Sequence, residues 1–184
     1  TNTGLDDMPD SAPGVLQPPP KPRVPELLLA AAAKKLGINA APMHRAVLTR
    51  PKDIRAACFY ATHCGRGCSI GAAFQTTTSL IPLARATGNL EVITDAMVKS
   101  VDIDAQGRAK AVTYIDKVTA EERHIDAPIV ILAASACESA RILLNSKSER
   151  FPTGLANSSG QVGKNLMDST GASLGAVIPA LKGR

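Results

Sequence analysis

The sequence is poor in aromatic residues, with no tryptophan, two tyrosines and three phenylalanines among its 184 residues. This scarcity argues against a nucleic-acid surface built on stacked rings and against a sugar-stacking lectin face. The hydrophobic fraction of 45% is nevertheless typical of a globular chain with a sizeable core. We therefore expect a folded domain that binds no nucleic acid.

Long apolar runs are also missing, and charge of one sign is not concentrated anywhere. The longest apolar runs, residues 27–33 and 129–136, are far shorter than the ~20 residues that span a bilayer. The formal net charge is +5, and the 21 lysines and arginines are spread through the chain. This distribution favours a solvated surface over a phosphate-binding patch. The chain begins without methionine and without a charged-then-apolar leader, so the sequence leaves export open. We expect no transmembrane segment in this chain.

Prolines concentrate near the start of the chain, where residues 18–20 are consecutive prolines. Proline fits neither a helix interior nor a central strand, so residues 1–25 are expected to be irregular and extended. A helix is then expected over residues 25–36, because proline and glutamate suit its first turn and glycine follows its last. Residues 47–49 predict a short strand and residues 79–86 a second helix.

Alternating apolar residues mark the middle of the chain as strands. Residues 104–107 read Asp-Ala-Gln-Gly, a good hairpin turn because glycine takes the positive φ that such turns often require. Residues 119–121 suggest a weaker second turn. The pattern predicts a small antiparallel meander with strands over residues 90–94, 97–103, 109–114 and 122–127.

An apolar run without alternation follows at residues 128–134 and predicts a strand buried on both faces, as in a parallel sheet. Residues 135–146 predict the next helix, in which Cys137 is expected to be a small core residue. A strand, a tight turn of small residues and a helix form the usual nucleotide-binding element. From residue 151 onward the chain is rich in glycine, serine and asparagine and is expected to be loop.

Three cysteines lie within eleven residues, Cys58, Cys64 and Cys68, separated by five and three residues. Neighbouring glycines allow the backbone to bend around one point and to aim amide groups at sulfur. Three ligands without a fourth favour a three-iron cluster or an open-site metal, whereas His63 would complete a Cys3His zinc site. Unligated thiols, or one disulfide with a free cysteine, are the structural alternative.

Three segments carry a resemblance to a known family. Residues 88–98 read GNLEVITDAMV, residues 129–146 read IVILAASACESARILLNS, and residues 155–168 read LANSSGQVGKNLMD. Together they resemble the GMC (glucose–methanol–choline) oxidoreductases, whose patterns are gNL.v.t.a.V, vvLAaga.eSprlLl.S and nssg.VGrNLmDH. Ser169 stands where the last pattern commonly has histidine.

The cysteine loop is similar to that of bacterial FAD-dependent sugar and polyol dehydrogenases with a [3Fe–4S] cluster. The ligand spacing of that branch matches Cys58, Cys64 and Cys68. Some relatives have a further cysteine where this chain has Ala61, so the cluster type stays open. The resemblance implies these three cysteines as ligands and a cytochrome or small subunit as electron-transfer partner.

The resemblance implies an α/β (α+β) fold class: part of an FAD-binding Rossmann-like fold with an inserted antiparallel meander and irregular loops. It also implies FAD as hydride acceptor and an alcohol, sugar or polyol as substrate. By family position, Val98 would contact the adenine end of FAD through its backbone, with Ala133 and Ala134 near the adenosine. Within one GMC N-terminal-type domain, the expected parts are residues 1–56 (proline-rich connection and helix), 57–88 (cysteine loop and helix) and 89–184 (partial FAD-binding domain).

Two family landmarks are missing from the sequence: the amino-terminal glycine-rich flavin fingerprint and the carboxy-terminal segment whose histidine supplies the base. We therefore expect an internal fragment without a complete active site, and we name no catalytic residue. The alternatives are a non-catalytic zinc module or an inactive truncated relative. The resemblance suggests a periplasmic or membrane-associated protein, and the strand at 128–134, lacking parallel neighbours, predicts marginal stability in isolation.

Overall fold

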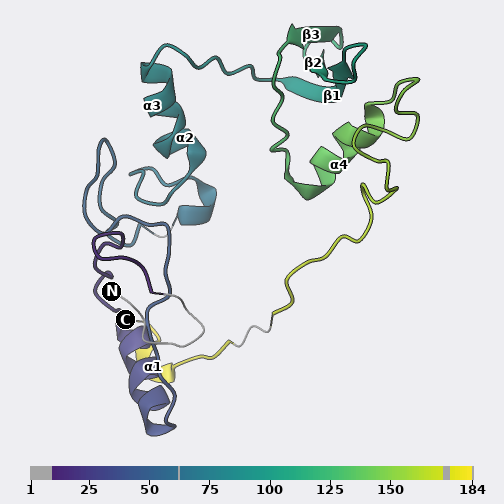
Figure 1. Ribbon diagram of the computed structural model, residues 1–184. Coiled ribbons are helices and arrows are strands. Elements are labelled where there is room, and N and C mark those ends of the chain that lie inside the picture. The colour runs from purple at the N-terminus through teal and green to yellow at the C-terminus, as the bar shows by residue number, and fades with distance from the viewer. Residues whose placement is uncertain (1–9, 62, 172–174, 184) are drawn as a thin grey trace. The chain divides into compact units, whose positions relative to one another are not determined.

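The computed structural model describes residues 10–61, 63–171 and 175–183. The chain divides into two compact units, Thr1–Glu91 with Ala176–Arg184, and Val92–Gly175 (Figure 1). Each unit is described by itself. Within the described residues, no helix combines the length and the apolar character that crossing a membrane requires.

The first unit begins with an irregular proline-rich stretch and the helix α1 (Val24–Lys35), as predicted. The backbone N–H of Arg23 donates to Glu26 Oε2 at 2.7 Å and so satisfies one amide at the open end of the helix. Two lysines occupy the last turn, where their charge complements the helix dipole. No residue of α1 is buried in the structure.

The second predicted helix is present as two shorter ones, α2 (Thr76–Ser79) and α3 (Ile81–Ala86), which meet at Leu80. Pro82 lies in the first turn of α3, and because it has no N–H it cannot continue the hydrogen-bond ladder of α2. The prediction of a strand over residues 47–49 was wrong, since Val47 forms only an isolated bridge with Ala73. Two short 3₁₀ turns complete this unit, η1 (Cys64–Arg66) and η2 (Pro179–Leu181).

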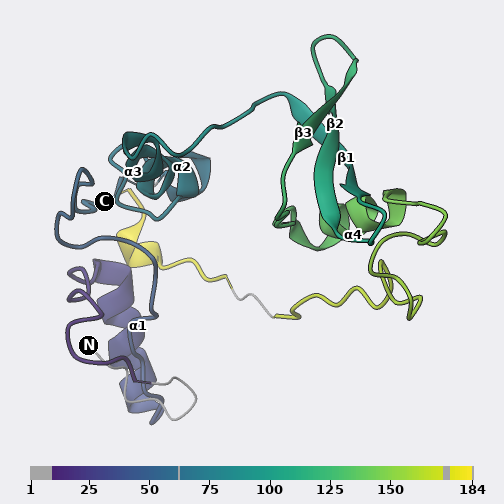
Figure 2. The same cartoon turned by 45° about the horizontal axis from the view of Figure 1, so that its top comes forward.

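The second unit contains the predicted antiparallel meander. Its strands are β1 (Ala96–Ile103), β2 (Ala109–Asp116) and β3 (Glu122–Asp126), in the order β1-β2-β3 (Figure 2). In the predicted hairpin turn, the Gly107 N–H donates to the Asp104 carbonyl at 2.9 Å, and Gly107 has φ +82°. The predicted strand over residues 90–94 does not form.

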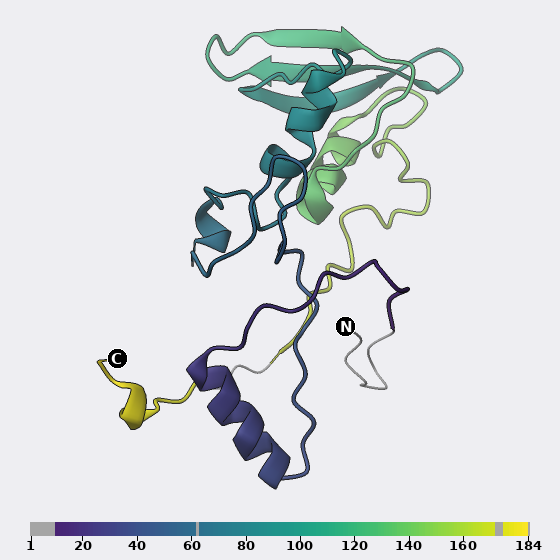
Figure 3. The same ribbon diagram turned by 90° about the vertical axis from the view of Figure 1, so that its left-hand side faces the viewer.

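The helix α4 (Ser135–Asn145) follows the meander and packs against β1, on one side of the sheet (Figure 3). Buried side chains of this unit include Val101 on β1, Tyr114 on β2 and Ile142 on α4. Ser146 joins the two elements, because its Oγ accepts the Val101 N–H at 2.8 Å and donates to the Ile142 carbonyl at 2.7 Å.

Two predictions for this unit were wrong. Residues 128–134 do not form a strand, and Ile129 and Ile131 are 78% and 84% exposed. A parallel strand needs neighbours for its backbone groups, and the only sheet in the described residues is the antiparallel meander. Cys137 is exposed, as are the other residues in the first turn of α4. The mixed α/β class therefore holds, whereas no parallel Rossmann-like sheet is present in the described parts of the chain.

Candidate functional site

The cysteine loop is closed at its base by backbone hydrogen bonds to the segment around Leu48. The Leu48 N–H donates to the Ala72 carbonyl, and the Cys58 N–H donates to the Leu48 carbonyl, each at 2.9 Å. Arg55 reinforces the closure, since its Nε donates to the Gly71 carbonyl at 2.7 Å. Both ends of the loop are therefore hydrogen-bonded to the same residue, Leu48.

Two of the three cysteines share a small core. Cys68 is buried together with Ala72 and Ala73, and Cys58 packs against this cluster. Cys64 lies on the turn η1 and is exposed. The structure thus brings Cys58 and Cys68 into one cluster and leaves Cys64 outside it.

Backbone amides point at both sulfur atoms of this cluster. The Ala73 N–H donates to Cys68 Sγ at 3.5 Å, and the Tyr60 N–H donates to Cys58 Sγ at 3.3 Å. The Ala73 N–H is the largest cause that lowers the pKa of Cys68, and neighbouring amides add to it against the effect of burial. Hydrogen bonds to sulfur favour the thiolate, which is the form of cysteine that binds metals.

These features fit a metal-bound thiolate at Cys58 and Cys68 but do not form a complete ligand set. Within residues 10–61, 63–171 and 175–183, no three His, Cys, Asp or Glu side chains lie together where a metal ion could bind. His63 immediately precedes η1 and is exposed, so the Cys3His arrangement is not assembled either. A cluster on all three cysteines would require Cys64 to turn toward the other two.

The proline-rich stretch forms a pocket of about 320 Å³ beside Cys58. Gln17 attaches this stretch to the segment around Leu48, because its Oε1 accepts hydrogen bonds from the N–H groups of Thr49 and Arg50 at 2.7 and 2.8 Å. At the other end of the proline-rich stretch, the Tyr60 hydroxyl donates a hydrogen bond to the Lys21 carbonyl. The sequence predicts no role for these residues, and their only signal is that Gln17 and Lys21 flank the prolines and Tyr60 follows Cys58.

The residues expected near FAD lie in the second unit. Val98 is half-buried on β1, directly before a β-bulge at which the register shifts between Val98 and Ser100. Its carbonyl accepts a hydrogen bond from Arg141 Nη2 at 2.8 Å. Bulges interrupt the ladder of a sheet and are common next to binding sites.

Ala133 and Ala134 directly precede α4, with Ala134 as its N-cap. Arg141 contacts Val98, and Ser146 contacts Val101, so α4 runs in the same direction as β1 and its first turn lies toward the Val98 end of the strand. No side chain caps the helix, which leaves its first backbone N–H groups open to an external acceptor. Small residues before an uncapped helix fit the close approach of a dinucleotide.

Ser135 begins α4 with φ +63°, a conformation that glycine adopts more easily. The family pattern vvLAaga.eSprlLl.S has glycine at this position. The same pattern includes the arginine and final serine that correspond to Arg141 and Ser146, and this was the signal that could have identified both residues from the sequence.

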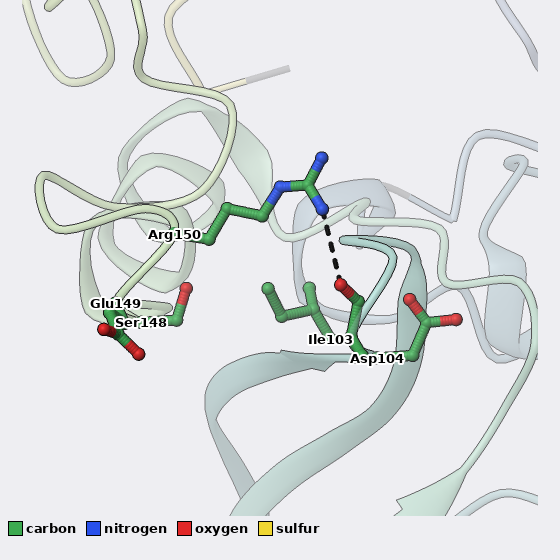
Figure 4. A pocket seen from close by; sticks show the side chains of 6 residues that line it. Ile103, Asp104, Ser148, Glu149 and Arg150 are labelled. Carbon is green, nitrogen blue, oxygen red and sulfur yellow. Dashed lines mark hydrogen bonds between the residues drawn. The ribbon is translucent and has the colours of Figure 1, made fainter.

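A second pocket, of about 440 Å³, lies between the hairpin turn and the segment after α4 (Figure 4). Arg150 reaches over it and donates from Nη1 to the Ala105 carbonyl at 3.4 Å. None of the residues expected to bind FAD or metal lines this pocket. It is an open surface depression and is not part of the candidate site.

Comparison with known proteins gives the following matches. The profile of the GMC oxidoreductase family matches residues 16–170. The 2-methyl-1,2-propanediol dehydrogenase of Mycolicibacterium austroafricanum is 37% identical over 150 residues, which are 82% of this chain and 27% of that protein. The fructose dehydrogenase large subunit of Gluconobacter japonicus is 32% identical over 137 residues, 74% of this chain and 25% of that protein.

The 6'''-hydroxyparomomycin C oxidase of Streptomyces lividus is 30% identical over 151 residues, 82% of this chain and 27% of that protein. The chain therefore spans about a quarter of the length of each of these relatives. Two of the three relatives are named as dehydrogenases and one as an oxidase.

Proposed function

Because this chain belongs to the GMC oxidoreductase family, we propose that it is part of an FAD-dependent oxidoreductase acting on CH–OH groups of alcohols, sugars or polyols. The observation that carries the proposal is the match over residues 16–170, together with relatives named for a diol and for fructose. The activity belongs to the full-length protein, of which this chain supplies part of the cofactor-binding region.

The proposed role of the second unit is to bind FAD, which would supply the hydride acceptor. The backbone of Val98 would contact the adenine end, and Ala133 and Ala134 would lie near the adenosine. The uncapped start of α4 supports this assignment, since it leaves backbone N–H groups available to a ligand. We assign no catalytic residue in this chain.

The proposal is tested on the purified full-length protein. We expect stoichiometric FAD, and bleaching of its absorbance when an alcohol, sugar or polyol is added without oxygen. A protein that binds no flavin, or whose flavin is reduced by none of these compounds, would contradict the proposal. Oxygen consumption that matches substrate turnover would indicate an oxidase instead of a dehydrogenase.

We also propose that Cys58, Cys64 and Cys68 hold a [3Fe–4S] cluster, which would supply one-electron transfer to a cytochrome or small-subunit partner. The amides directed at Cys58 and Cys68 support ligation of these two residues. The assignment of Cys64 rests on the family spacing, because this residue is exposed outside the cluster of the other two.

Metal analysis of anaerobically purified protein tests this assignment. We expect about three irons and four acid-labile sulfides per chain, with an EPR signal that Cys64→Ser abolishes. Cys137→Ser is the matched control, since Cys137 is exposed on α4 and should leave the signal unchanged. Flavin without iron would show that the loop is structural, and one zinc per chain would support a zinc site.

A further inference from the structure

Arg141 connects the two segments to which FAD contacts are assigned. Its Nη2 donates to the Val98 carbonyl at 2.8 Å, across 43 residues of sequence. Its Nε donates to Glu138 Oε2 at 2.8 Å, one turn earlier on α4. The side chain is two-thirds buried, at 34% exposure, so these contacts are not those of a solvated surface arginine.

The position of the contact on β1 explains why a side chain is needed. A strand carbonyl normally accepts a hydrogen bond from a partner on a neighbouring strand, but β1 is an edge strand of the sheet, and the Val98 carbonyl on its outer side has no such partner among the described residues. The guanidinium of Arg141 replaces that partner and fixes the orientation of the peptide between Val98 and Lys99. A planar guanidinium can hold a carboxylate and a carbonyl together in fixed directions, whereas a lysine ammonium cannot.

We propose that Arg141 is a positioning residue for FAD: it holds the Val98 peptide in place and fixes its spacing from the first turn of α4. This inference rests on the FAD contact proposed above for Val98. Arg141 acts through Val98 and does not itself touch the cofactor. Because Glu138 neutralises its charge, its effect does not come from attraction of the FAD phosphates.

The test measures FAD binding to the deflavinated full-length protein by fluorescence titration. We expect Arg141→Met to weaken FAD binding about 10-fold, because the Val98 peptide, no longer held in place, must be ordered when FAD binds. Arg141→Lys should weaken binding nearly as much, because lysine keeps the charge but not the fixed geometry. Added FAD should restore turnover that Arg141→Met loses at low FAD, which a loss of folded protein would not allow.

Two further variants separate positioning from charge and from general damage. Glu138→Ala frees the guanidinium, so we expect weaker FAD binding, whereas attraction of phosphate would predict tighter binding. Arg150→Met is the matched control, because Arg150 also contacts a backbone carbonyl of this unit. That carbonyl belongs to Ala105, in the hairpin turn beyond the other end of β1 from Val98, so the variant should leave FAD affinity unchanged.

Wild-type affinity in Arg141→Met, or tighter binding in Glu138→Ala, would overturn the positioning role while leaving the proposed function intact. If Arg141→Met does not fold, Glu138→Ala decides, since Glu138 is exposed and tolerates truncation. A wild-type protein that binds no FAD would overturn both this inference and the proposed function.

Discussion

Among the glycines that the structure describes, Gly154 is the one whose added Cβ would collide with backbone atoms. It lies against the end of α4, where the Leu155 N–H donates to the Leu143 carbonyl at 2.9 Å. A Cβ at position 154 would lie 2.8 Å from the Leu143 oxygen and 2.9 Å from Leu144 Cα, and both atoms are helix backbone. Its φ of +104° is also outside the range that L-residues adopt readily.

The cost of Gly154→Ala follows from these two effects. An L-residue held in a sparsely populated backbone region costs about 1–3 kcal/mol. An added methyl group that displaces packed backbone costs about 1–3 kcal/mol more. Together they give a loss of about 2–6 kcal/mol, which is a large part of the ~5–15 kcal/mol that stabilises a typical domain.

Two other glycines separate the contributions. Gly160 has φ +67° but no atom within 4 Å of a built Cβ, so Gly160→Ala should cost only the conformational strain, about 1–2 kcal/mol. Gly171 has open space and no positive φ, so Gly171→Ala should change stability by less than about 0.5 kcal/mol.

Amide hydrogen exchange in β1, β2 and α4 of the full-length protein measures the local free energy of opening without assuming two-state unfolding of a large chain. We expect the largest loss of protection for Gly154→Ala, a smaller one for Gly160→Ala and none for Gly171→Ala. Equal protection in the first two variants would refute the close approach of residue 154 to α4.

Three further predictions concern the same unit. Ser146→Ala leaves the buried Val101 N–H without its partner and should destabilise the contact of α4 with β1 by about 1–3 kcal/mol, seen as faster exchange of the Val101 amide. Ser135→Gly relieves a φ of +63° and should raise the melting temperature, whereas Ser139→Gly in the same helix should cost about 1 kcal/mol. Hydrogen bonds from backbone N–H groups, that of Arg108 first, lower the pKa of Asp104 in the folded protein. The stability that this carboxylate contributes is therefore complete above its unfolded pKa of about 4 and is lost as the pH falls through the lower folded value. Asp104→Asn should remove this loss when amide hydrogen exchange of the hairpin is followed through an acid titration.

Elements with a strong local signal were predicted correctly. The helix α1 has proline and glutamate at its start and glycine after its end, and the hairpin at Gly107 has the residue that its turn requires. Local signals suffice here because a helix turn or a tight hairpin satisfies its backbone groups among neighbouring residues. The prediction that residues 128–134 form a strand was wrong because a strand is satisfied only by a partner, and none of the described residues provides one.

The sequence named candidate residues for the site but not their geometry. The spacing of the cysteines indicated a shared site, and the structure places Cys58 and Cys68 in one cluster while Cys64 stays exposed. The contact between Arg141 and Val98 could not be derived from spacing, because it depends on which carbonyls of the edge strand β1 lack a strand partner and on the direction in which α4 runs along it.

The sequence by itself determined the family, the antiparallel meander and the concentration of thiols, since each depends on which residues are neighbours along the chain. Only the tertiary structure decided which groups meet: the amides directed at Cys58 and Cys68, the close approach of Gly154 to α4, and the arginine that replaces a missing ladder bond at Val98. These contacts join residues far apart in sequence, and their geometry follows from packing and from the need of every buried backbone group for a hydrogen-bond partner.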